Sequence, residues 1–561
     1  MEKRALLAIA LSILIFILWD FFFVPKEKPA PPPPSGNGQT TSTAPGQTPA
    51  PSKQPPPQPE TGITPEIPAP VATVPSFPLP PAHTGKEVVV ETSLYRAVFT
   101  ETGARLKSFV LKRYRETIEK NSPHKELVKN SKVEEMPLAF NFMNHPVAAL
   151  NLAPFVADRA SVQIKGKQPA NLTFTYEAPG WLRISRQYHF YPDSYLIDHT
   201  VKVENLGSQP WEDAPTLNLI NSPFSSQHGR YTFQGPALLL NEALEEVKFK
   251  KIKGEKRFSG PINWVAYTDQ YFCMMVAPLD LKPNDAVLKA VDESTKMVET
   301  TFIGPKVMIQ PGAEQEFRFK IYAGPKEVKL LKAADLKLEK VVNFGWFDVI
   351  AQPLLVCLKF FNRFTRNYGL AIILLTVVIK ILFWPLTHKS YKSMQAMKKL
   401  QPKMAKIREK YRDEKDKMNQ EIMQLYRSHK VNPLGGCLPM ILQIPVFFAL
   451  YRVLYSSIAM RHAPFALWIN DLSAPDRLQV GFSIPYLGGL PVLTLLMGVS
   501  MFVQQKMTPT AGDPRQEKMM LMMPVVFTVF FVNFPSGLVL YWLVNNILSI
   551  GQQYYINKKA A

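Results

Sequence analysis

Cysteine is scarce in this chain of 561 residues. The three cysteines, Cys273, Cys357 and Cys437, lie in different regions and show no paired spacing. A disulfide framework or a structural zinc site would need cysteines at short, regular spacings. The sequence therefore predicts neither a disulfide-stabilised fold nor a metal site, and we expect no cofactor.

Sequence motifs for nucleotide hydrolysis, dinucleotide binding and zinc-dependent proteolysis are absent. No GxxxxGK[ST], GxGxxG or HExxH occurs in the chain, so a P-loop ATPase and a zinc protease find no support. We expect a protein that is not an enzyme and performs no hydrolytic or redox chemistry. Energy for any work at a membrane would come from the substrate or from the membrane.

Charge is nearly missing from residues 5–24. A basic start, up to Arg4, precedes an apolar run that extends to Val24 and contains one acidic residue, Asp20. No small-x-small cleavage pattern follows, so we interpret residues 1–24 as an uncleaved signal-anchor helix, with a removed signal peptide as the alternative. The basic flank is expected in the cytoplasm, and the chain that follows is expected to be exported.

Bulky side chains are almost missing from residues 25–85. Twenty of the 51 prolines fall in these 61 positions, among Thr, Ser, Gln and Gly. Such a segment cannot bury enough apolar surface to fold, and its prolines favour extended PPII stretches. We interpret it as a disordered linker, and a ligand for a PPII-binding domain is the alternative.

Residues 86–335 alternate between apolar and polar side chains over many short runs. Period-two patterning with turn residues between the runs predicts a large antiparallel all-β domain, a sandwich outside the membrane. Its histidines show no spacing typical of metal ligands or of a catalytic triad, so we expect an interaction or scaffold domain. The clearest runs are Tyr95–Thr100, Leu172–Ala178, Arg186–Pro192, Tyr195–Asn205 and Phe317–Gly324.

Beyond Asn343 the sequence becomes helical and apolar. Residues 336–367 contain Trp346–Phe364, a stretch of mixed charged, apolar and aromatic residues that is typical of an amphipathic helix in the outer membrane interface. Residues 368–557 hold five apolar runs long enough to cross a bilayer, which together with residues 1–24 predict six transmembrane helices, five of them in one bundle. These runs are Tyr368–Thr387, Leu434–Ile458, Leu487–Met507, Met519–Phe534 and Gly537–Ile556.

Much of the net charge of +20 lies in one loop. Residues 388–430 hold thirteen Lys and Arg against five Asp and Glu, which indicates a cytoplasmic loop first and a nucleic-acid patch only second. Apolar residues recur there at spacings of three and four, which predicts a helical hairpin that packs mainly against itself. They are Leu400, Met404, Ile407, Tyr411, Met418, Ile422 and Leu425.

Acidic residues are missing from all five runs, yet one run contains a lysine far from either of its ends. Lys380 lies inside Gly369–Leu386, where a central Lys costs roughly 2.5 to 3.5 kcal/mol of insertion free energy. Such a residue usually faces a water-filled cavity or a protein partner. The alternative is a side chain that snorkels to the nearer interface, but Thr376, one turn away on the same face, favours the cavity.

Other polar residues in these runs would also be penalised by lipid. They form stripes on helices of the predicted bundle, which favours a hydrophilic cavity; hydrogen bonds that only hold the bundle together are the alternative. A positive charge in such a cavity would attract an acidic group from another protein. The residues are Gln443, Gln504, Gln505, Asn545, Asn546, Ser549, Gln552 and Gln553.

Two other functions fit a set of spans joined to a β-domain. A secondary transporter or channel would use a coupling carboxylate or an inverted repeat within the spans, and the sequence shows neither. A membrane-tethered carbohydrate-binding domain would need only one span.

Several long motifs resemble the YidC family of membrane protein insertases, and the match covers about residues 344–557 densely. The anchor, the Pro-rich segment and the β-domain are similar to its Gram-negative members. The resemblance implies a β-supersandwich, related in fold to sugar-binding and aldose-epimerase domains. The motifs are Thr376–Thr387 (TVVIKILFWPLT), Leu400–Pro402 (LQP), Val431–Pro445 (VNPLGGCLPMILQIP), Ala463–Leu472 (APFALWINDL), Phe534–Trp542 (FPSGLVLYW) and Asn545–Gln553.

The resemblance implies an insertase and chaperone of the bacterial inner membrane, with a periplasmic β-domain and both termini in the cytoplasm. Nascent membrane proteins would enter a hydrophilic groove open to the cytoplasm and to lipid, with or without the Sec translocon. Residues 388–430 would contact a ribosome or the signal recognition particle receptor, and we expect no direct nucleic-acid function. The expected groove residues are Lys380, Thr376, Gln443, Gln504, Asn545, Ser549 and Gln552, and the expected substrate-contact aromatics are Tyr541 and Trp542.

The sequence departs from the family pattern at two positions. The groove cation of the family is usually Arg and falls on Lys380, which keeps the charge but lacks the planar fork that binds a carboxylate through two hydrogen bonds. The groove threonine of the family falls on Thr376. An aromatic position, commonly Tyr, falls on Trp542, beside Tyr541.

The tail, residues 558–561, is short, so we expect no ribosome binding through it.

Overall fold

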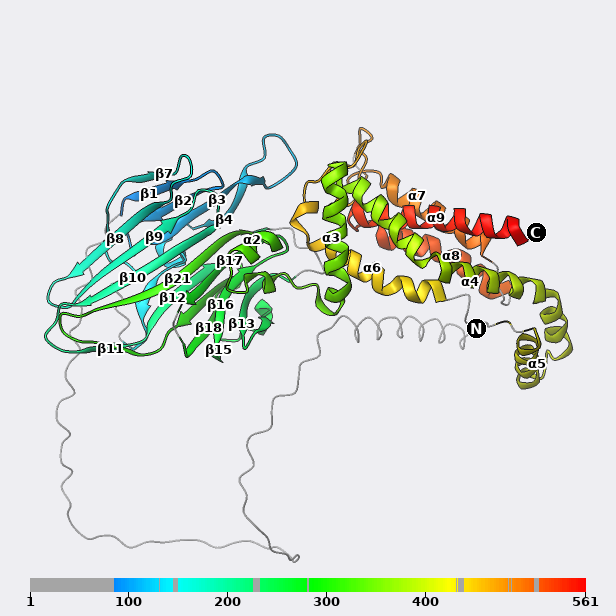
Figure 1. Cartoon of the computed structure of the whole chain (residues 1–561), viewed down its shortest axis with the longest axis horizontal. Coiled ribbons are helices and arrows are strands. Elements are labelled where there is room, and N and C mark those ends of the chain that lie inside the picture. The colour runs from blue at the N-terminus through cyan, green and yellow to red at the C-terminus, as the bar shows by residue number, and fades with distance from the viewer. Residues whose placement is uncertain are drawn as a thin grey trace, which may run out of the picture. The chain divides into compact units, whose positions relative to one another are not determined.

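The structure is a computed structural model that describes residues 85–560, apart from gaps at 131, 145–149, 226–232, 280–281, 430, 432–437, 483, 486 and 509–513. Figure 1 traces the described elements along the chain. The signal anchor and the Pro-rich linker predicted for residues 1–85 lie outside the described residues, except for Gly85.

Residues 87–325 form the β-domain, and its strands follow the predicted runs closely. The strands β2, β8, β9, β10 and β21 contain most or all of the five runs named above. The described strands are β1 (Glu87–Glu91), β2 (Tyr95–Thr100), β3 (Arg105–Arg115), β4 (His124–Lys129), β5 (Phe140–Phe142), β6 (Val156–Ala157), β7 (Ser161–Gln163), β8 (Ala170–Ala178), β9 (Leu182–Phe190), β10 (Leu196–Asn205), β11 (Trp211–Asp213), β12 (Pro215–Asn221), β13 (Gly235–Leu240), β14 (Ala243–Glu246), β15 (Glu255–Gly260), β16 (Ile262–Thr268), β17 (Phe272–Leu279), β18 (Asn284–Asp292), β19 (Met297–Ile303), β20 (Val307–Ile309) and β21 (Glu314–Pro325).

A nine-stranded antiparallel sheet is the largest layer of the β-domain, with the order β14-β13-β16-β17-β21-β10-β9-β8-β6. Two five-stranded sheets have the orders β4-β3-β2-β1-β7 and β15-β18-β19-β12-β5, and β11 pairs with β20. Along β9 and β10 buried residues alternate with half-exposed ones, as expected for strands with one face on a core. The structure thus confirms the predicted all-β domain.

Aromatic side chains join the two five-stranded sheets to the nine-stranded sheet. Phe99 of β2 lies 4.7 Å from Tyr188 of β9 between ring centroids, and Phe302 of β19 lies 6.0 Å from Phe319 of β21. Buried residues of all three sheets belong to one hydrophobic cluster. The β-domain therefore folds around a shared core, as two sheets stacked on a larger third would require.

A fully buried arginine, Arg186 of β9, connects the three sheets. Its guanidinium donates to the carbonyl oxygens of Gly103 (2.8 Å) and Leu138 (2.6 Å) and to the Tyr188 hydroxyl (2.7 Å). Gly103 lies between β2 and β3, and Leu138 precedes β5. Because a buried cation is costly without hydrogen-bond acceptors, these contacts fix the loops of both smaller sheets.

Burial, together with the charge of Arg186, keeps His199 on β10 neutral. The His199 ring is fully buried, with Nε2 3.2 Å from the Arg186 guanidinium and Nδ1 3.2 Å from the Gln187 carbonyl. A neutral ring that donates from Nδ1 and accepts at Nε2 satisfies both contacts. Burial, and next the charge of Arg186, hold the pKa of His199 well below its usual range.

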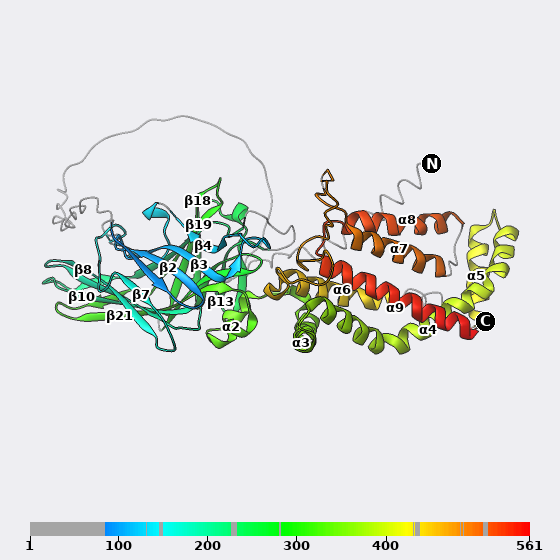
Figure 2. The ribbon, with the colours of Figure 1, turned by 90° about the horizontal axis from the view of Figure 1, so that it is seen from above.

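Helices form the second part of the chain. They are α2 (Val328–Ala333), α3 (Asp348–Thr365), α4 (Tyr368–Lys410), α5 (Lys415–Ser428), α6 (Leu438–Ser456), α7 (Val492–Met507), α8 (Pro514–Phe531) and α9 (Ser536–Ala560). α9 packs against α4 and α7, α7 packs against α8, and α3 packs against α4 and α6. Figure 2 shows the same helices from above, with α7 beside α8 and α9 beside α4.

The helix that carries Lys380 is longer than predicted. The sequence indicated a span ending at Thr387 and a separate helix in the following loop, whereas α4 continues without a break to Lys410. The helix persists because Tyr391, Met394 and Met397 extend its buried face at helical spacing. Within the described ranges, α4 is the one helix that is long and apolar enough to cross a membrane; α7 and Met520–Phe531 are shorter apolar helices.

The end of α4 and all of α5 form the predicted helical hairpin. Met397, Leu400, Met404 and Tyr426 are its buried residues, and Ile422 and Leu425 pack against them. The hairpin thus packs against itself, as the sequence indicated. Ile407, Tyr411 and Met418 lie outside this cluster and are half-exposed, close to the turn that joins the two helices.

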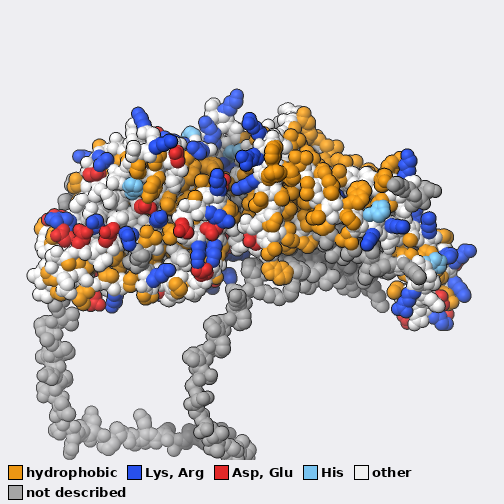
Figure 3. Space-filling view, in the orientation of Figure 1, with side chains coloured by type: hydrophobic (Ala, Val, Ile, Leu, Met, Phe, Trp, Pro, Cys, Tyr) orange, Lys and Arg blue, Asp and Glu red, His pale blue; other side chains and the backbone are white. Residues whose placement is uncertain are grey.

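Exposed apolar side chains cover much of the helical part. Figure 3 shows them as a broad orange area. On α3 the side chains of Ala351, Leu355 and Leu358 are buried, whereas Val349 is 85% exposed and Phe364 70% exposed. A helix with one apolar face on the core and another turned outward is typical of a membrane environment rather than water.

We predict that His199 makes the stability of the β-domain depend on pH. The unfolded state takes up a proton below about pH 6.5 while the folded imidazole stays neutral, so stability is intact above that pH and falls below it. Relative to His199→Gln, the wild type should lose about 2 kcal/mol of unfolding free energy between pH 7 and pH 5. Thermal unfolding of the full chain in micelles, followed by near-UV circular dichroism, measures this.

The control for this experiment is His124→Gln, since His124 is exposed on β4. It should keep the wild-type pH dependence. An unchanged pH dependence in His199→Gln would show that the buried imidazole is not the titrating group.

We also predict opposite effects of alanine at two helical glycines. A Cβ at Gly498 of α7 would collide with the Thr528 side chain of α8, whose hydroxyl is bonded to the Pro524 carbonyl at 2.7 Å. A Cβ at Gly551 of α9 would meet nothing within 4 Å. Gly498→Ala should therefore cost about 1 to 3 kcal/mol of stability, whereas Gly551→Ala should gain up to about 1 kcal/mol.

Thermal unfolding midpoints of both variants in the same detergent test this. Equal destabilisation by the two substitutions would contradict a close α7–α8 contact.

Candidate functional site

Lys380 lies on α4 where the buried and the exposed faces of the helix meet. Ile379 is buried, whereas Ile381 and Leu382 are 65% and 71% exposed. The Lys380 ammonium turns toward α9 and donates a hydrogen bond of 2.6 Å to the Ser549 hydroxyl. Because the five apolar runs contain no Asp or Glu, the partner of this cation in the bundle is a neutral group.

Ser549 is held in place by two further contacts. It is 2% exposed, and its hydroxyl donates to the Asn545 carbonyl one turn earlier on α9 at 2.7 Å. The Tyr391 hydroxyl also bonds to it. A hydroxyl oxygen with one donor committed to its own helix can still accept from an ammonium.

Two more hydrogen bonds continue this contact between α4 and α9. Gln552 Nε2 donates to Thr387 Oγ1 at 2.8 Å, and Gln395 Nε2 donates to Asn557 Oδ1 at 2.6 Å. We call the three pairs Lys380–Ser549, Thr387–Gln552 and Gln395–Asn557 the polar seam. Three of the predicted groove residues, Lys380, Ser549 and Gln552, thus belong to the polar seam. The sequence did not predict its other three members, Thr387, Gln395 and Asn557.

Gln443 of α6 forms a second polar contact with α9. Its side-chain amide donates to the Tyr541 hydroxyl and, at 3.3 Å, to Asn545 Oδ1. Asn545 also provides the carbonyl that accepts from Ser549. The structure therefore brings the predicted residues Gln443 and Asn545 to the side of α9 next to the polar seam.

α7 meets α9 through polar groups as well. Asn546 Nδ2 donates to Ser500 Oγ at 3.0 Å, and Gln553 Nε2 donates to the Met507 carbonyl at 2.8 Å. Ser500 was missed by the sequence analysis, although a small hydroxyl inside an apolar run was a signal that could have indicated it.

Two predicted groove residues do not join these contacts. Thr376 is fully buried, and its hydroxyl donates to the Ile372 carbonyl of its own helix at 2.7 Å. Gln504 is half-buried on α7, and within the described ranges its side chain forms no hydrogen bond to the other groove residues. Position on one helix face was not enough to predict contact, because Thr376 satisfies its hydroxyl locally.

The two predicted aromatics lie on different sides of α9. Tyr541 is 1% exposed and faces Gln443. Trp542 is partly buried, with its ring 4.8 Å from Phe447 of α6 and 5.2 Å from Phe531 of α8. Trp542 thus forms an apolar contact between α6 and α8. Tyr541 instead places its hydroxyl in the polar contact between α9 and α6.

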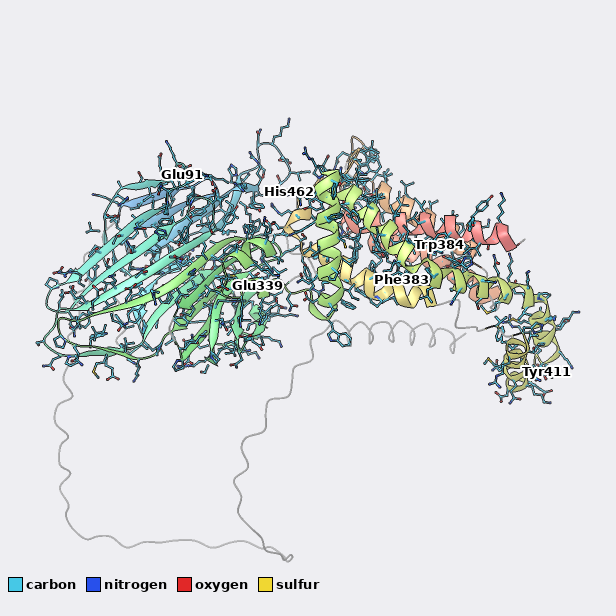
Figure 4. The ribbon with its side chains drawn as sticks, in the orientation of Figure 1. Glu91, Glu339, Phe383, Trp384, Tyr411 and His462 are labelled. Carbon is cyan, nitrogen blue, oxygen red and sulfur yellow. The ribbon has the colours of Figure 1, made fainter. Side chains whose placement is uncertain are left out.

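Aromatic side chains also mark α4 just beyond Lys380. Phe383 and Trp384 project from α4, and Tyr411 follows its end (Figure 4). Trp384 is 41% exposed. An exposed Trp near the end of an apolar helical stretch is typical of the membrane–water boundary.

Family comparisons cover nearly the whole described chain. The model described as "60Kd inner membrane protein" matches residues 360–561, and the model described as "YidC periplasmic domain" matches residues 87–357. The boundary between the two falls within α3.

Two relatives and one solved structure show the extent of the similarity. The membrane protein insertase YidC of Syntrophobacter fumaroxidans is 45% identical over 582 residues, and that of Syntrophus aciditrophicus is 42% identical over 567; both matches cover 100% of each chain. A crystal structure described as an active YidC insertase is 20% identical, with a TM-score of 0.37, and covers 84% of this chain and 93% of its own. On the sequence matches, the chain belongs to the membrane protein insertase YidC family.

Proposed function

We propose that this chain inserts other proteins into the bacterial inner membrane and assists their folding, without hydrolytic or redox chemistry of its own. The single observation that carries the mechanism is the bond from Lys380 to Ser549. It holds a cation in an apolar helix without neutralising it, at the border between the bundle and its exposed surface.

An acidic residue of a client protein would displace Ser549 from Lys380. A carboxylate brings a full opposite charge to the Lys380 ammonium, whereas the Ser549 hydroxyl offers it only a dipole. The exchange is favourable once both charges are removed from bulk water, and it leaves the Ser549 hydroxyl bonded to the Asn545 carbonyl. Lys380 thus attracts the acidic part of a client segment without holding it in one orientation, as the compact charge of Lys allows.

Buried polar atoms without partners support a hydrated groove beside the polar seam. Among the described residues, Gln505 Nε2, Gln552 Oε1 and Gln553 Oε1 are buried and accept or donate no hydrogen bond. Such atoms usually bond to water or to a ligand. A hydrophilic client segment could replace that water, so that it would not need to cross bare hydrocarbon.

The apolar part of a client would leave the groove along α6 and α8. Trp542, Phe447 and Phe531 offer a continuous aromatic wall there, and the adjoining surface of α8 is apolar and exposed at Val526 and Val529. Insertion is driven by the removal of the client helix's apolar surface from water, first against this wall and then in lipid, at roughly 25 cal/mol per Å².

We propose six spans: residues 1–24, the apolar part of α4, and α6, α7, α8 and α9. The positive-inside rule places the basic hairpin of α4 and α5 and both termini in the cytoplasm and the β-domain in the periplasm. The inner membrane and the periplasmic domain agree with the two family models.

The hairpin of α4 and α5 is the proposed contact for a ribosome or for the signal recognition particle receptor, and the Sec translocon is a proposed partner of the bundle. Lys398, Lys399 and Arg412 are exposed on the hairpin. These exposed cations would also bind anionic lipid headgroups.

We predict that the charge of residue 380 determines the insertion of acidic clients. Lys380→Glu should lower insertion of a single-span test protein with an acidic tail by about tenfold or more, because attraction becomes repulsion. Lys380→Arg should insert it as well as the wild type. Insertion into proteoliposomes is measured as the fraction of client protected from protease.

The matched control is Lys389→Glu, the same charge change on an exposed residue nine positions further along α4, which should have little effect. A second control replaces the acidic tail by its amide counterpart and should remove the difference between Lys380→Glu and Lys380→Arg. Equal insertion of the acidic client by both variants would refute the electrostatic role.

A further inference from the structure

A cavity with a mixed polar and apolar lining lies where the end of α3 meets the first residue of α4 and the end of α6, and Tyr114 of β3 and Lys326 after β21 also line it. Its volume is about 490 Å³. Its lining mixes apolar residues with polar ones, and it includes one carboxylate, that of Glu327. The cationic and hydroxyl residues include Lys326, Lys359, Arg363, Tyr368, Ser456 and Ser457. The cavity is separate from the polar seam, which lies between α4 and α9.

The cations of this cavity are only loosely neutralised. Lys359 Nζ is 4.0 Å from a carboxylate oxygen of Glu327, at the limit of an ion pair. Arg363, one helical turn after Lys359, is exposed and forms no ion pair within the described ranges. From Val349 to Arg408 the chain contains no acidic residue, so Glu327 is the one carboxylate among the residues that line the cavity.

Stabilisation of the helix end does not account for both cations. Arg363 lies in the last turn of α3 and complements the helix dipole there. Lys359 lies six residues before the end of α3, and the dipole effect is confined to the last turn. The second cation therefore needs another explanation.

An unpaired acceptor adds a second requirement on the ligand. Asn362 also lines the cavity, and its Oδ1 is buried without a hydrogen-bond partner among the described residues. A buried amide oxygen in this state requires a donor such as a hydroxyl or ammonium group. A ligand that carries both an anionic oxygen and a donor would satisfy Lys359, Arg363 and Asn362 together.

Apolar side chains flank the cavity on α3. Phe360 is 56% exposed and Phe364 70% exposed, next to Lys359 and Arg363 in the sequence. The apolar stretch of α4 begins at Gly369, directly after Tyr368 of the cavity. These apolar surfaces suit acyl chains, and they adjoin cations that suit lipid headgroups.

We propose that this cavity binds the headgroup of an anionic phospholipid. The phosphodiester contacts Lys359 and Arg363, a headgroup hydroxyl donates to Asn362, and the acyl chains lie along Phe360 and Phe364. The bound lipid would tie α3 to α4 at the membrane surface.

Lipid binding to the full chain in nonionic micelles tests the proposal. The probes are dioctanoyl phosphatidylglycerol, dioctanoyl phosphatidylcholine and inorganic phosphate, with binding measured by isothermal titration calorimetry. We expect phosphatidylglycerol to bind at least about tenfold more tightly than either other probe, since it offers an unneutralised phosphate, a hydroxyl and acyl chains at once. Equal affinity for phosphatidylcholine would overturn the charge requirement, and equal affinity for phosphate would overturn the lipid assignment.

The site is tested by the double substitution Lys359→Gln and Arg363→Gln, which should weaken phosphatidylglycerol binding about tenfold or more. The charge-matched control is Lys253→Gln with Arg96→Gln, two exposed cations of the β-domain, and it should bind as the wild type does. Wild-type affinity in the Lys359→Gln, Arg363→Gln variant, or an equal loss of affinity in the two double variants, would overturn the site. If the first pair does not fold, Asn362→Leu keeps both charges and should still weaken phosphatidylglycerol binding; undiminished binding would overturn the site.

Discussion

The helical bundle depends on hydrogen bonds that α9 makes with three different neighbours. Asn545 bonds to α6, Asn546 to α7 and Ser549 to α4. In lipid, apolar packing alone does little to bring helices together, so polar contacts and close approach supply much of their association. α9 is therefore the element around which the other helices are placed, and the position of the cation on α4 follows from it.

The cation is the costly part of this arrangement. A lysine in an apolar helix is tolerated where water or a partner reduces the cost, and the Ser549 hydroxyl supplies one hydrogen bond without removing the charge. A carboxylate at position 549 would have neutralised Lys380 and left nothing to attract a client. Two adjoining features complete the site. Amide atoms of α7 and α9 that have no hydrogen-bond partner among the described residues favour water inside, and the aromatic wall around Trp542 favours apolar segments outside.

Periodicity was enough to predict the elements but not their partners. The alternation along β9 and β10 predicted strands with one buried face, and the apolar runs predicted helices close to α6, α7 and α9. Lys380 and Ser549 were both expected in one groove, yet their contact joins residues 169 positions apart and depends on how α4 packs on α9. Thr376 shows the limit of sequence spacing: it shares a face with Lys380, but its hydroxyl bonds to its own backbone. The length of α4 was also missed, since the change from apolar to charged residues after Thr387 does not interrupt its buried face.

The central claim is that Lys380 meets an acidic residue of the client during insertion. A charge exchange tests this most directly: the Lys380→Glu chain is combined with a single-span client whose acidic tail residue is replaced by lysine, and insertion into proteoliposomes is measured by protease protection. Restoration of insertion to near the wild-type level is the predicted result, because attraction is re-established with the signs reversed. If the exchanged pair inserts no better than Lys380→Glu with the acidic client, the two charges do not meet and the account is wrong.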